Sequence, residues 1–162
     1  MKSGGSKPTK GSKAEASTDV LIGENRKARF HYEILDTYEA GIVLRGTEVK
    51  VLRQGQISLD ESYAKLEDGE LWLIGVNIPV YSHGNLQNHE PKRKRKCLLH
   101  SRELGKLREK SLVKGLTLVP LRVYFGSRGF AKVTIGVGRG RKLHDKREHL
   151  KEKDAKREMR QA

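Results

Sequence analysis

The sequence predicts a mainly β fold with flanking helices, arranged as a small antiparallel β-barrel. Strand-like runs of apolar and polar residues dominate residues 32–74. The pair Asp68-Gly69 separates two of these runs, which is the pattern of a tight β-hairpin. Two more runs, 116–125 and 130–137, are joined by a short segment that contains two glycines. About five or six strands with two helices fit a small closed antiparallel sheet.

The first predicted elements are a long strand and a short helix. Residues 32–44 read as one strand, with Gly41 at a bend or bulge. Thr47 is a suitable N-cap for a helix that ends before Gly55. Tyr38, within the strand, fits either core packing or stacking on an unpaired RNA base.

The hairpin comes next along the chain. Residues 62–67 and 70–74 flank the Asp-Gly pair, which suits a type I′ turn because that turn needs positive φ at both central positions. Trp72 has a leucine on each side in the second strand, and we expect it in the core. Residues 79–91 contain two prolines and a glycine, so they read as a loop.

A helix is predicted from Pro91 to residue 110. At 3.6 residues per turn Cys97 shares one face with four leucines, Leu98, Leu104, Leu107 and Leu112, and is therefore expected to be buried. Five consecutive cations occupy residues 92–96, at the predicted start of this helix. Cations are unfavourable at a helix N-terminus unless a polyanion faces them, so the segment favours phosphate contact over a plain solvated surface.

Positive charge is the strongest functional signal in the composition. The 162 residues include 34 Lys and Arg against 20 Asp and Glu, a formal net charge of +14. Such a surplus attracts phosphates and releases counterions on binding, which favours a nucleic-acid partner. A merely soluble surface would not need this imbalance. An anionic membrane surface is the other alternative, but no basic helix here has a strong apolar face.

Several classes of protein are not expected from this sequence. It has no run of about 18 apolar residues for a membrane span, and its first residues lack the apolar core of a secretory signal. The single cysteine excludes a disulfide framework and suits a reducing cytoplasm. The six histidines show no metal-ligand spacing. We therefore expect no metal, no cofactor and no catalytic group, although folding can assemble groups that a sequence does not reveal.

Three regions follow from the distribution of charge and hydropathy. Residues 1–24 read as a disordered basic arm, 25–141 as an RNA-binding β-barrel domain and 142–162 as a basic C-terminal tail. From residue 139 onward the chain has ten Lys and Arg and five Asp and Glu, a net of +5, with few large apolar residues. Such a segment is expected to be frayed alone and to become helical when a partner surrounds it.

The glycine-rich segment 136–142 (GVGRGRK) resembles a phosphate-binding loop at first sight. It lacks the Gly-Lys-Ser/Thr ending of such loops, and no βαβ unit surrounds it. Two interpretations remain: a strand exit whose amides and cations approach an RNA backbone, or a flexible basic hinge.

Several successive segments resemble those of small protein B, the bacterial tmRNA-binding (SsrA-binding) protein family. The resemblance covers about residues 25–160 in order, which makes it more specific than any single motif. The segments are 25–29 (NRKAR), 38–44 (YEAGIVL), 46–50 (GTEVK), 95–100 (RKCLLH), 115–121 (GLTLVPL), 131–133 (AKV) and 140–147 (GRKLHDKR).

The resemblance implies an oligonucleotide-binding-type barrel and a role in trans-translation. Members of this family bind the tRNA-like domain of tmRNA and carry it to stalled ribosomes. There the tail enters the decoding centre and the empty mRNA channel of the small subunit, which allows peptide tagging and ribosome release. Elongation factor Tu and alanyl-tRNA synthetase are further partners, reached through the charged tmRNA. No bond chemistry, cofactor or membrane is implied, and the location is the bacterial cytoplasm.

The resemblance also assigns roles to individual positions. Phe30 stands where the family usually has a histidine, and its ring could stack on a base. The positions expected to face RNA are Asn25, Arg26, Lys27, Glu39, Leu98, His100, Lys132, Arg139, Arg141 and Lys142. The positions expected at the decoding centre are His144, Asp145, Lys146 and Arg147.

Two other functions remain open from the sequence. A general ribosome-associated or single-strand-binding barrel would share the fold and charge but lack preference for tmRNA. A nucleotide-processing enzyme would use the glycine-rich segment to bind its nucleotide.

Overall fold

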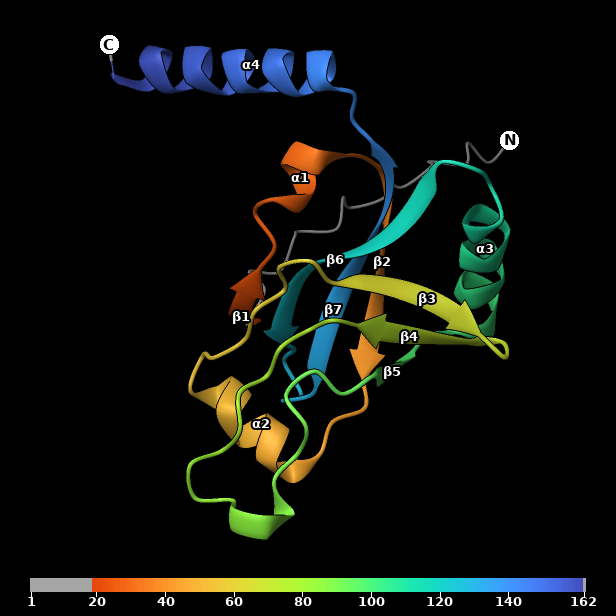
Figure 1. The fold of residues 1–162 in the computed structure, drawn as a ribbon, viewed down its shortest axis with the longest axis vertical. Helices are drawn as coiled ribbons and strands as arrows, with labels where there is room; N and C mark the ends of the chain where they lie inside the picture. The colour runs from red at the N-terminus through yellow and green to blue at the C-terminus, as the bar shows by residue number, and fades with distance from the viewer. Residues whose placement is uncertain (1–18, 162) are drawn as a thin grey trace, which may run out of the picture.

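A computed structural model of the chain describes residues 19–161, most of which surround one antiparallel sheet (Figure 1). The sheet has seven strands in the order β1-β6-β3-β4-β5-β2-β7, and an additional β6–β7 pairing closes six of them into a ring. The strands are β1 (Val20–Glu24), β2 (Tyr32–Ile42), β3 (Tyr63–Glu67), β4 (Glu70–Ile74), β5 (Arg95–Leu98), β6 (Leu116–Phe125) and β7 (Ala131–Gly140). The predicted mainly β fold with flanking helices is confirmed.

Four α-helices and one short 3-10 helix accompany the ring. α2 lies at one end of the molecule, α3 lies at the side near β3, and α4 extends away from the opposite end (Figure 1). The helices are α1 (Ala28–His31), α2 (Gly46–Arg53), η1 (Asn85–Gln87), α3 (Ser101–Ser111) and α4 (Leu143–Gln161).

The β3–β4 hairpin forms where the Asp-Gly pair predicted it. Asp68 and Gly69 have φ angles of 51° and 75°, the positive values that a type I′ turn requires. The flanking pair Glu67–Glu70 begins an antiparallel ladder that runs to Tyr63–Ile74. This element follows from local turn chemistry alone.

The core fills the inside of the ring. Leu71, Leu73 and Ile135 are at most 1% exposed, and Leu52 of α2 and Leu107 of α3 join the same apolar cluster. The prediction that Trp72 lies in this core is wrong. Successive residues of a strand point to opposite faces, so with both neighbouring leucines inside, Trp72 lies on the outer face and is only half-buried.

The folded region begins earlier than residue 25. Val20–Glu24 form β1, which pairs with the last half of β6 from Arg122 to Phe125. The predicted arm boundary at residue 24 is therefore wrong, since five of its residues belong to the sheet. The rest of the predicted arm, residues 1–18, lies outside the described residues.

The predicted helix from Pro91 to residue 110 is correct only in its second part. Residues 95–98 form β5, in which Arg95 and Cys97 point inward while Lys96 and Leu98 point outward. The two-residue period of this strand was hidden within a longer pattern that also fits a helix. Cys97 is buried as predicted, but on a strand, and burial raises the pKa of its thiol to about 12.

The glycines of segment 136–142 serve close packing within β7. A β-carbon on Gly138 would lie 2.8 Å from the Cβ of Tyr32, and one on Gly136 would lie 3.0 Å from Leu121. The segment is therefore a regular strand as far as Gly140 and not a flexible hinge. The predicted bend or bulge at Gly41 is wrong, because the irregularity in the pairing of β2 with β7 lies between Ile34 and Asp36.

Candidate nucleic-acid interface

Three strands and the residue before α3 bring four of the predicted RNA-facing residues to one hollow. Gly41 of β2 pairs with Leu98 of β5 on one side and with Lys132 of β7 on the other. Glu39 lies two residues earlier on β2, and His100 immediately precedes α3. The hollow has a volume of about 450 Å³ and is lined by Glu39, Ala40, Gly41, Leu98, Leu99, His100, Glu103 and Lys132. We call it the Glu39–Lys132 hollow.

The chemistry of this hollow is mixed, as recognition of an RNA base and its backbone requires. Glu39 supplies an exposed acceptor, and Lys132 supplies an exposed cation. Leu98 is 54% exposed although it is apolar, so it presents an uncovered apolar surface beside them. A carboxylate, an ammonium and an apolar side chain can together hold a donor, a phosphate and the face of a base or ribose.

Sequence reasoning missed a polar row on β6 next to this hollow. Tyr124 pairs in register with Lys132, and Arg122 pairs with Thr134. The Arg122 guanidinium carbon lies 5.1 Å from the centre of the Tyr124 ring, and its Nε donates to Thr134 Oγ1 at 3.3 Å. Burial, and then the carboxylate of Glu39, raise the pKa of Tyr124 well above its usual value. The signal was the strand alternation, which turns Arg122 and Tyr124 to the same face.

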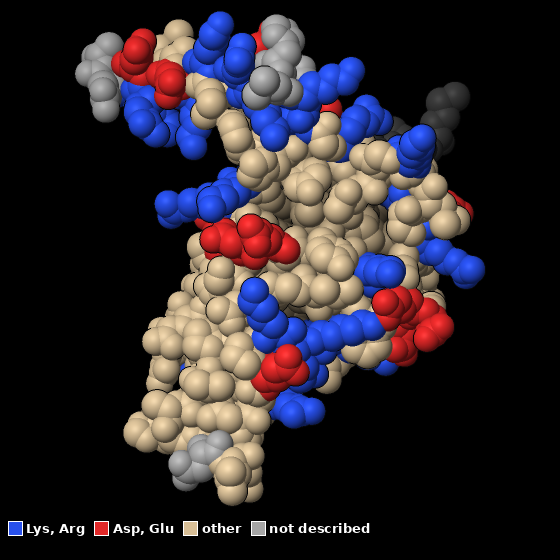
Figure 2. Space-filling model, in the orientation of Figure 1, with Lys and Arg blue, Asp and Glu red and all other residues tan. Residues whose placement is uncertain are grey.

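A second basic surface lies where β7 leaves the sheet. Arg139 pairs with Glu33 of β2, and Lys142 is exposed in the two-residue connection between β7 and α4. A hollow of about 400 Å³ here is lined by Glu33, Arg139, Gly140, Arg141, Lys142, Glu148, His149 and Glu152. Figure 2 shows Lys and Arg side chains gathered over α4 and the adjacent end of the barrel.

The start of α4 is attached to α1. The backbone amide of Arg141 donates to His31 O at 2.9 Å, and its Nε donates to Arg29 O at 3.3 Å. The ammonium of Lys146 lies 5.7 Å from the centre of the Phe30 ring. Beyond this contact the tail extends into solvent, and the side chains of its residues 151–160 are exposed.

All four predicted decoding-centre residues lie in α4. Arg147 is exposed and Lys146 is half-buried against Phe30. The side chains of His144 and Asp145 lie outside the described part of the structure. The tail is helical here; its dependence on a partner for that helix stays a prediction.

Asn25 differs from the other predicted RNA-facing residues because its amide is used within the protein. It is 8% exposed, and its Nδ2 donates to Leu59 O at 3.3 Å and to Pro120 O at 3.1 Å. Its Oδ1 accepts from the amide of Ala28 at 3.2 Å, which fixes the turn into α1. The side chains available for RNA at this turn are those of Arg26 and Lys27, both exposed.

The five cations of residues 92–96 do not form the open phosphate site that the sequence favoured. Arg95 is 1% exposed, and its Nε donates to Glu48 Oε2 at 2.5 Å. Arg93 donates to the other oxygen of Glu48, also at 2.5 Å. The remaining pairs are Lys94 with Glu67, and Lys96 with Glu70 at 2.7 Å.

Lys92 is the member of this segment for which the described residues contain no carboxylate partner. Lys94 additionally lies 4.7 Å from the centre of the Trp72 ring, so its ammonium lies over this outward-facing side chain. The segment therefore stabilises the barrel through pairs that a linear sequence does not reveal.

Among the side chains that the structure describes, no group of three His, Cys, Asp or Glu residues could hold a metal ion. None of the helices in this range is long and apolar enough to cross a membrane.

Comparison with known proteins places the chain among close relatives. It is 57% identical over 134 residues to an SsrA-binding protein of Rhizobium etli (strain CIAT 652), covering 83% of this chain and 84% of the relative. It is 54% identical over 146 residues to an SsrA-binding protein of Chelativorans sp. (strain BNC1), covering 90% and 94%. An SsrA-binding protein of Sphingopyxis alaskensis is 55% identical over 147 residues, 91% of each chain.

A solved structure agrees with these relatives. It is described as "tmRNA-SmpB: a journey to the center of the bacterial ribosome", and its matching chain is 56% identical with a TM-score of 0.64. The match covers 74% of this chain and 84% of that one. The model of the SmpB protein family matches residues 22–162. The chain therefore belongs to the SmpB protein family.

Proposed function

We propose that this chain is an RNA-binding adaptor of trans-translation. It binds the tRNA-like domain of tmRNA through the barrel, delivers it to stalled ribosomes and places its tail in the empty mRNA channel. The observation that carries the proposal is the Glu39–Lys132 hollow, where three strands gather an acceptor, a cation and an exposed apolar side chain. The relatives' name, SsrA-binding protein, supports the same RNA as the ligand.

In this proposal the barrel recognises RNA by combining one acceptor with several cations. Glu39 accepts a hydrogen bond from a base amino group or a 2′-hydroxyl, because a carboxylate repels phosphate and needs a donor. Lys132 neutralises a neighbouring phosphate, and Leu98 contacts the face of a base or ribose. His100 adds a donor at the same hollow. Arg26, Lys27, Arg139, Arg141 and Lys142 extend the phosphate contacts.

The tail has a different task in the proposal. His144, Asp145, Lys146 and Arg147 lie in its first turns, where they contact the decoding centre and take the place of codon–anticodon pairing. The exposed cations further along α4 face the RNA walls of the channel. Because α4 has almost no apolar face, phosphates replace the missing core as its partner.

The protein makes and breaks no bonds itself in this role. It acts in the bacterial cytoplasm, with tmRNA and the small ribosomal subunit as direct partners. Elongation factor Tu and alanyl-tRNA synthetase are reached through the charged tmRNA.

The decisive measurement compares Kd for the tRNA-like domain of tmRNA and for bulk tRNA at one fixed salt concentration. The wild-type chain should prefer the first RNA strongly, and a ratio near one would instead support a general RNA-binding barrel. Glu39→Ala should weaken binding of the tRNA-like domain by about 10-fold to about 100-fold, because a charge-assisted hydrogen bond is lost.

The direction in which Glu39→Ala changes RNA affinity separates a specific contact from general electrostatics. Removing an acid makes the protein more positive, so electrostatics alone would strengthen RNA binding. Glu90→Ala is the matched control, since it removes an exposed acid from the loop before β5. Its affinity should stay at or slightly above wild type. Unchanged or tighter binding by Glu39→Ala, with the fold intact, would contradict the recognition role of Glu39.

A further inference from the structure

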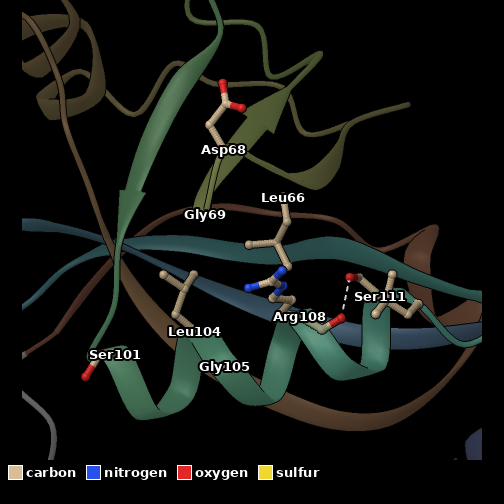
Figure 3. Close-up of a pocket in the computed structure, with 9 residues that line it drawn as sticks. Leu66, Asp68, Gly69, Ser101, Leu104, Gly105, Arg108 and Ser111 are labelled. Carbon is tan, nitrogen blue, oxygen red and sulfur yellow. Dashed lines mark hydrogen bonds between the residues drawn. The ribbon is translucent and has the colours of Figure 1, made fainter.

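A larger hollow lies between α3 and the β3–β4 hairpin, and the proposed function leaves it unassigned. Its volume is about 520 Å³, and it is lined by Leu66, Asp68, Gly69, Ser101, Leu104, Gly105, Arg108, Ser111 and Leu112. Figure 3 shows Leu104 and Arg108 rising from α3 toward Leu66, while the carboxylate of Asp68 points away from the helix. We call this space the α3 hollow.

The α3 hollow runs along one side of the helix, opposite the β3–β4 hairpin. α3 packs on the core through Leu107, which is fully buried. Leu104, Arg108 and the C-cap residue Leu112 follow at intervals of four residues; Leu104 also packs against the core, whereas Leu112 is 81% exposed. A β-carbon on Gly105 would meet no atom within 4 Å, so the floor of the hollow is open at that point. Apolar walls and an open floor leave room for a flat group.

Arg108 brings an available cation to this space. Among the described residues its guanidinium makes no hydrogen bond, ion pair or ring contact. Lys110, two residues later, is by contrast paired with Asp36 at 2.5 Å. An arginine with a free planar face beside leucine side chains can stack on a nucleobase and also reach a phosphate.

The α3 hollow and the Glu39–Lys132 hollow are lined by neighbouring residues of the chain. They meet at the start of α3: His100 and Glu103 line the Glu39–Lys132 hollow, whereas Ser101 and Leu104 line the α3 hollow. A strand of RNA held at Glu39 and Lys132 can therefore pass over the start of α3 and reach Arg108.

We propose that the α3 hollow is a second RNA-contact site, which takes one unpaired nucleotide of the RNA bound at the Glu39–Lys132 hollow. The base stacks on the Arg108 guanidinium between Leu66 and Leu104. An acidic protein segment is the other class of ligand that an arginine with apolar walls could hold. The position of the α3 hollow next to the first hollow and the net charge of +14 favour RNA. The identity of that RNA rests on the proposed function.

Two variants test the site by different routes. Arg108→Ala removes the stacking cation, and Gly105→Leu fills the hollow without changing the charge. Leucine also favours a helix more than glycine does, so the second variant keeps the fold. Each should raise Kd for the tRNA-like domain of tmRNA by about 10-fold, the order expected for loss of one stacked base. Gly105→Leu should leave the salt dependence of binding unchanged, because no phosphate contact is removed.

The matched control is Arg102→Ala, which removes an exposed arginine of the same helix that lines neither hollow. Its Kd should rise less than about 3-fold. Wild-type affinity in both test variants would overturn the proposal. Wild-type RNA affinity combined with loss of peptide tagging on ribosomes would also overturn it, because the occupant would then be a ribosomal component.

Failure of the proposed function is a separate result. It would appear as equal wild-type affinity for the tRNA-like domain and for bulk tRNA. The same two variants, measured on bulk tRNA, would then still decide whether the α3 hollow binds RNA.

Discussion

The chain has two strongly basic segments, residues 92–96 and residues 139–160, and the fold treats them differently. In the first, Arg93 and Arg95 share the carboxylate of Glu48, and the two lysines between and after them pair with acids of the β3–β4 hairpin. In the second, Arg139, Lys142 and the cations from residue 151 onward are exposed. The number of cations in a segment therefore does not measure the positive charge that it offers to a partner.

Removal of the tail should have the largest functional effect. Deleting residues 144–162 takes away most of the second basic segment while leaving the barrel and the Glu39–Lys132 hollow intact. We expect affinity for the tRNA-like domain to stay within about 3-fold of wild type, because few of its phosphate contacts are removed. Peptide tagging in a reconstituted translation reaction should be abolished. Equal losses of binding and tagging would show that the tail is simply another RNA clamp.

Disrupting the ion pairs of the first segment should instead lower the stability of the fold. Glu48 is fully buried, and Glu48→Gln would leave two arginines without their carboxylate. We expect the free energy of unfolding to fall by about 3–5 kcal/mol, the usual cost of removing one partner of a buried ion pair. Urea unfolding measures this change, with the exposed Glu90→Gln as a control that should shift it by less than about 0.5 kcal/mol.

The same pair predicts a pH dependence. Burial alone would raise the pKa of Glu48, but hydrogen bonds from the Arg45 amide, Arg93 and Arg95 outweigh it and hold that pKa below its usual 4.5. A carboxyl with a lowered pKa in the folded state adds stability that is fully present above 4.5 and is lost as the pH falls through the folded-state value. The stability difference between wild type and Glu48→Gln should therefore shrink below about pH 4.5. A difference that stays constant down to pH 3 would contradict this assignment.

The smallest expected effect is on the salt dependence of RNA binding, measured after removal of one cation from each segment. Lys142→Ala should reduce the slope of log K against log salt by about 0.7–0.9 for the tRNA-like domain, because one phosphate contact is lost. Lys96→Ala should leave the slope almost unchanged, since Glu70 already neutralises this lysine. A full unit of slope lost in Lys96→Ala would show that the pair opens and that the first segment also meets phosphate.

Local chemistry explains which parts of the fold the sequence predicts well. The Asp68-Gly69 turn fixes its hairpin because only the two central residues decide it. The strands 116–125 and 130–137 were predicted from two runs joined by a glycine-containing turn, and the second is observed from Ala131 to Gly140. Trp72 was misplaced although the same alternation, read from its buried leucine neighbours, puts it outside.

Contacts between distant segments explain the rest. Arg95 is buried because Glu48, 47 residues away, accepts its hydrogen bond, and no local pattern records that pairing. The Glu39–Lys132 hollow combines Glu39, Leu98 and Lys132 from three strands. These residues were therefore predicted from the family resemblance and not from their spacing in the sequence. Arg122 and Tyr124 were missed because their neighbours are set by the β6–β7 register.

The strand β1 also protects an edge of the sheet. β6 pairs with β7 along most of its length, but its second neighbour changes from β3 at Leu118 to β1 between Arg122 and Phe125. Without β1 the latter half would present unpaired backbone groups, which is a template for edge-to-edge aggregation. A truncation that keeps Val20 and all later residues should therefore keep the protein soluble. A shorter chain that begins at Asn25 would lack β1 and would expose an aggregation-prone edge of β6.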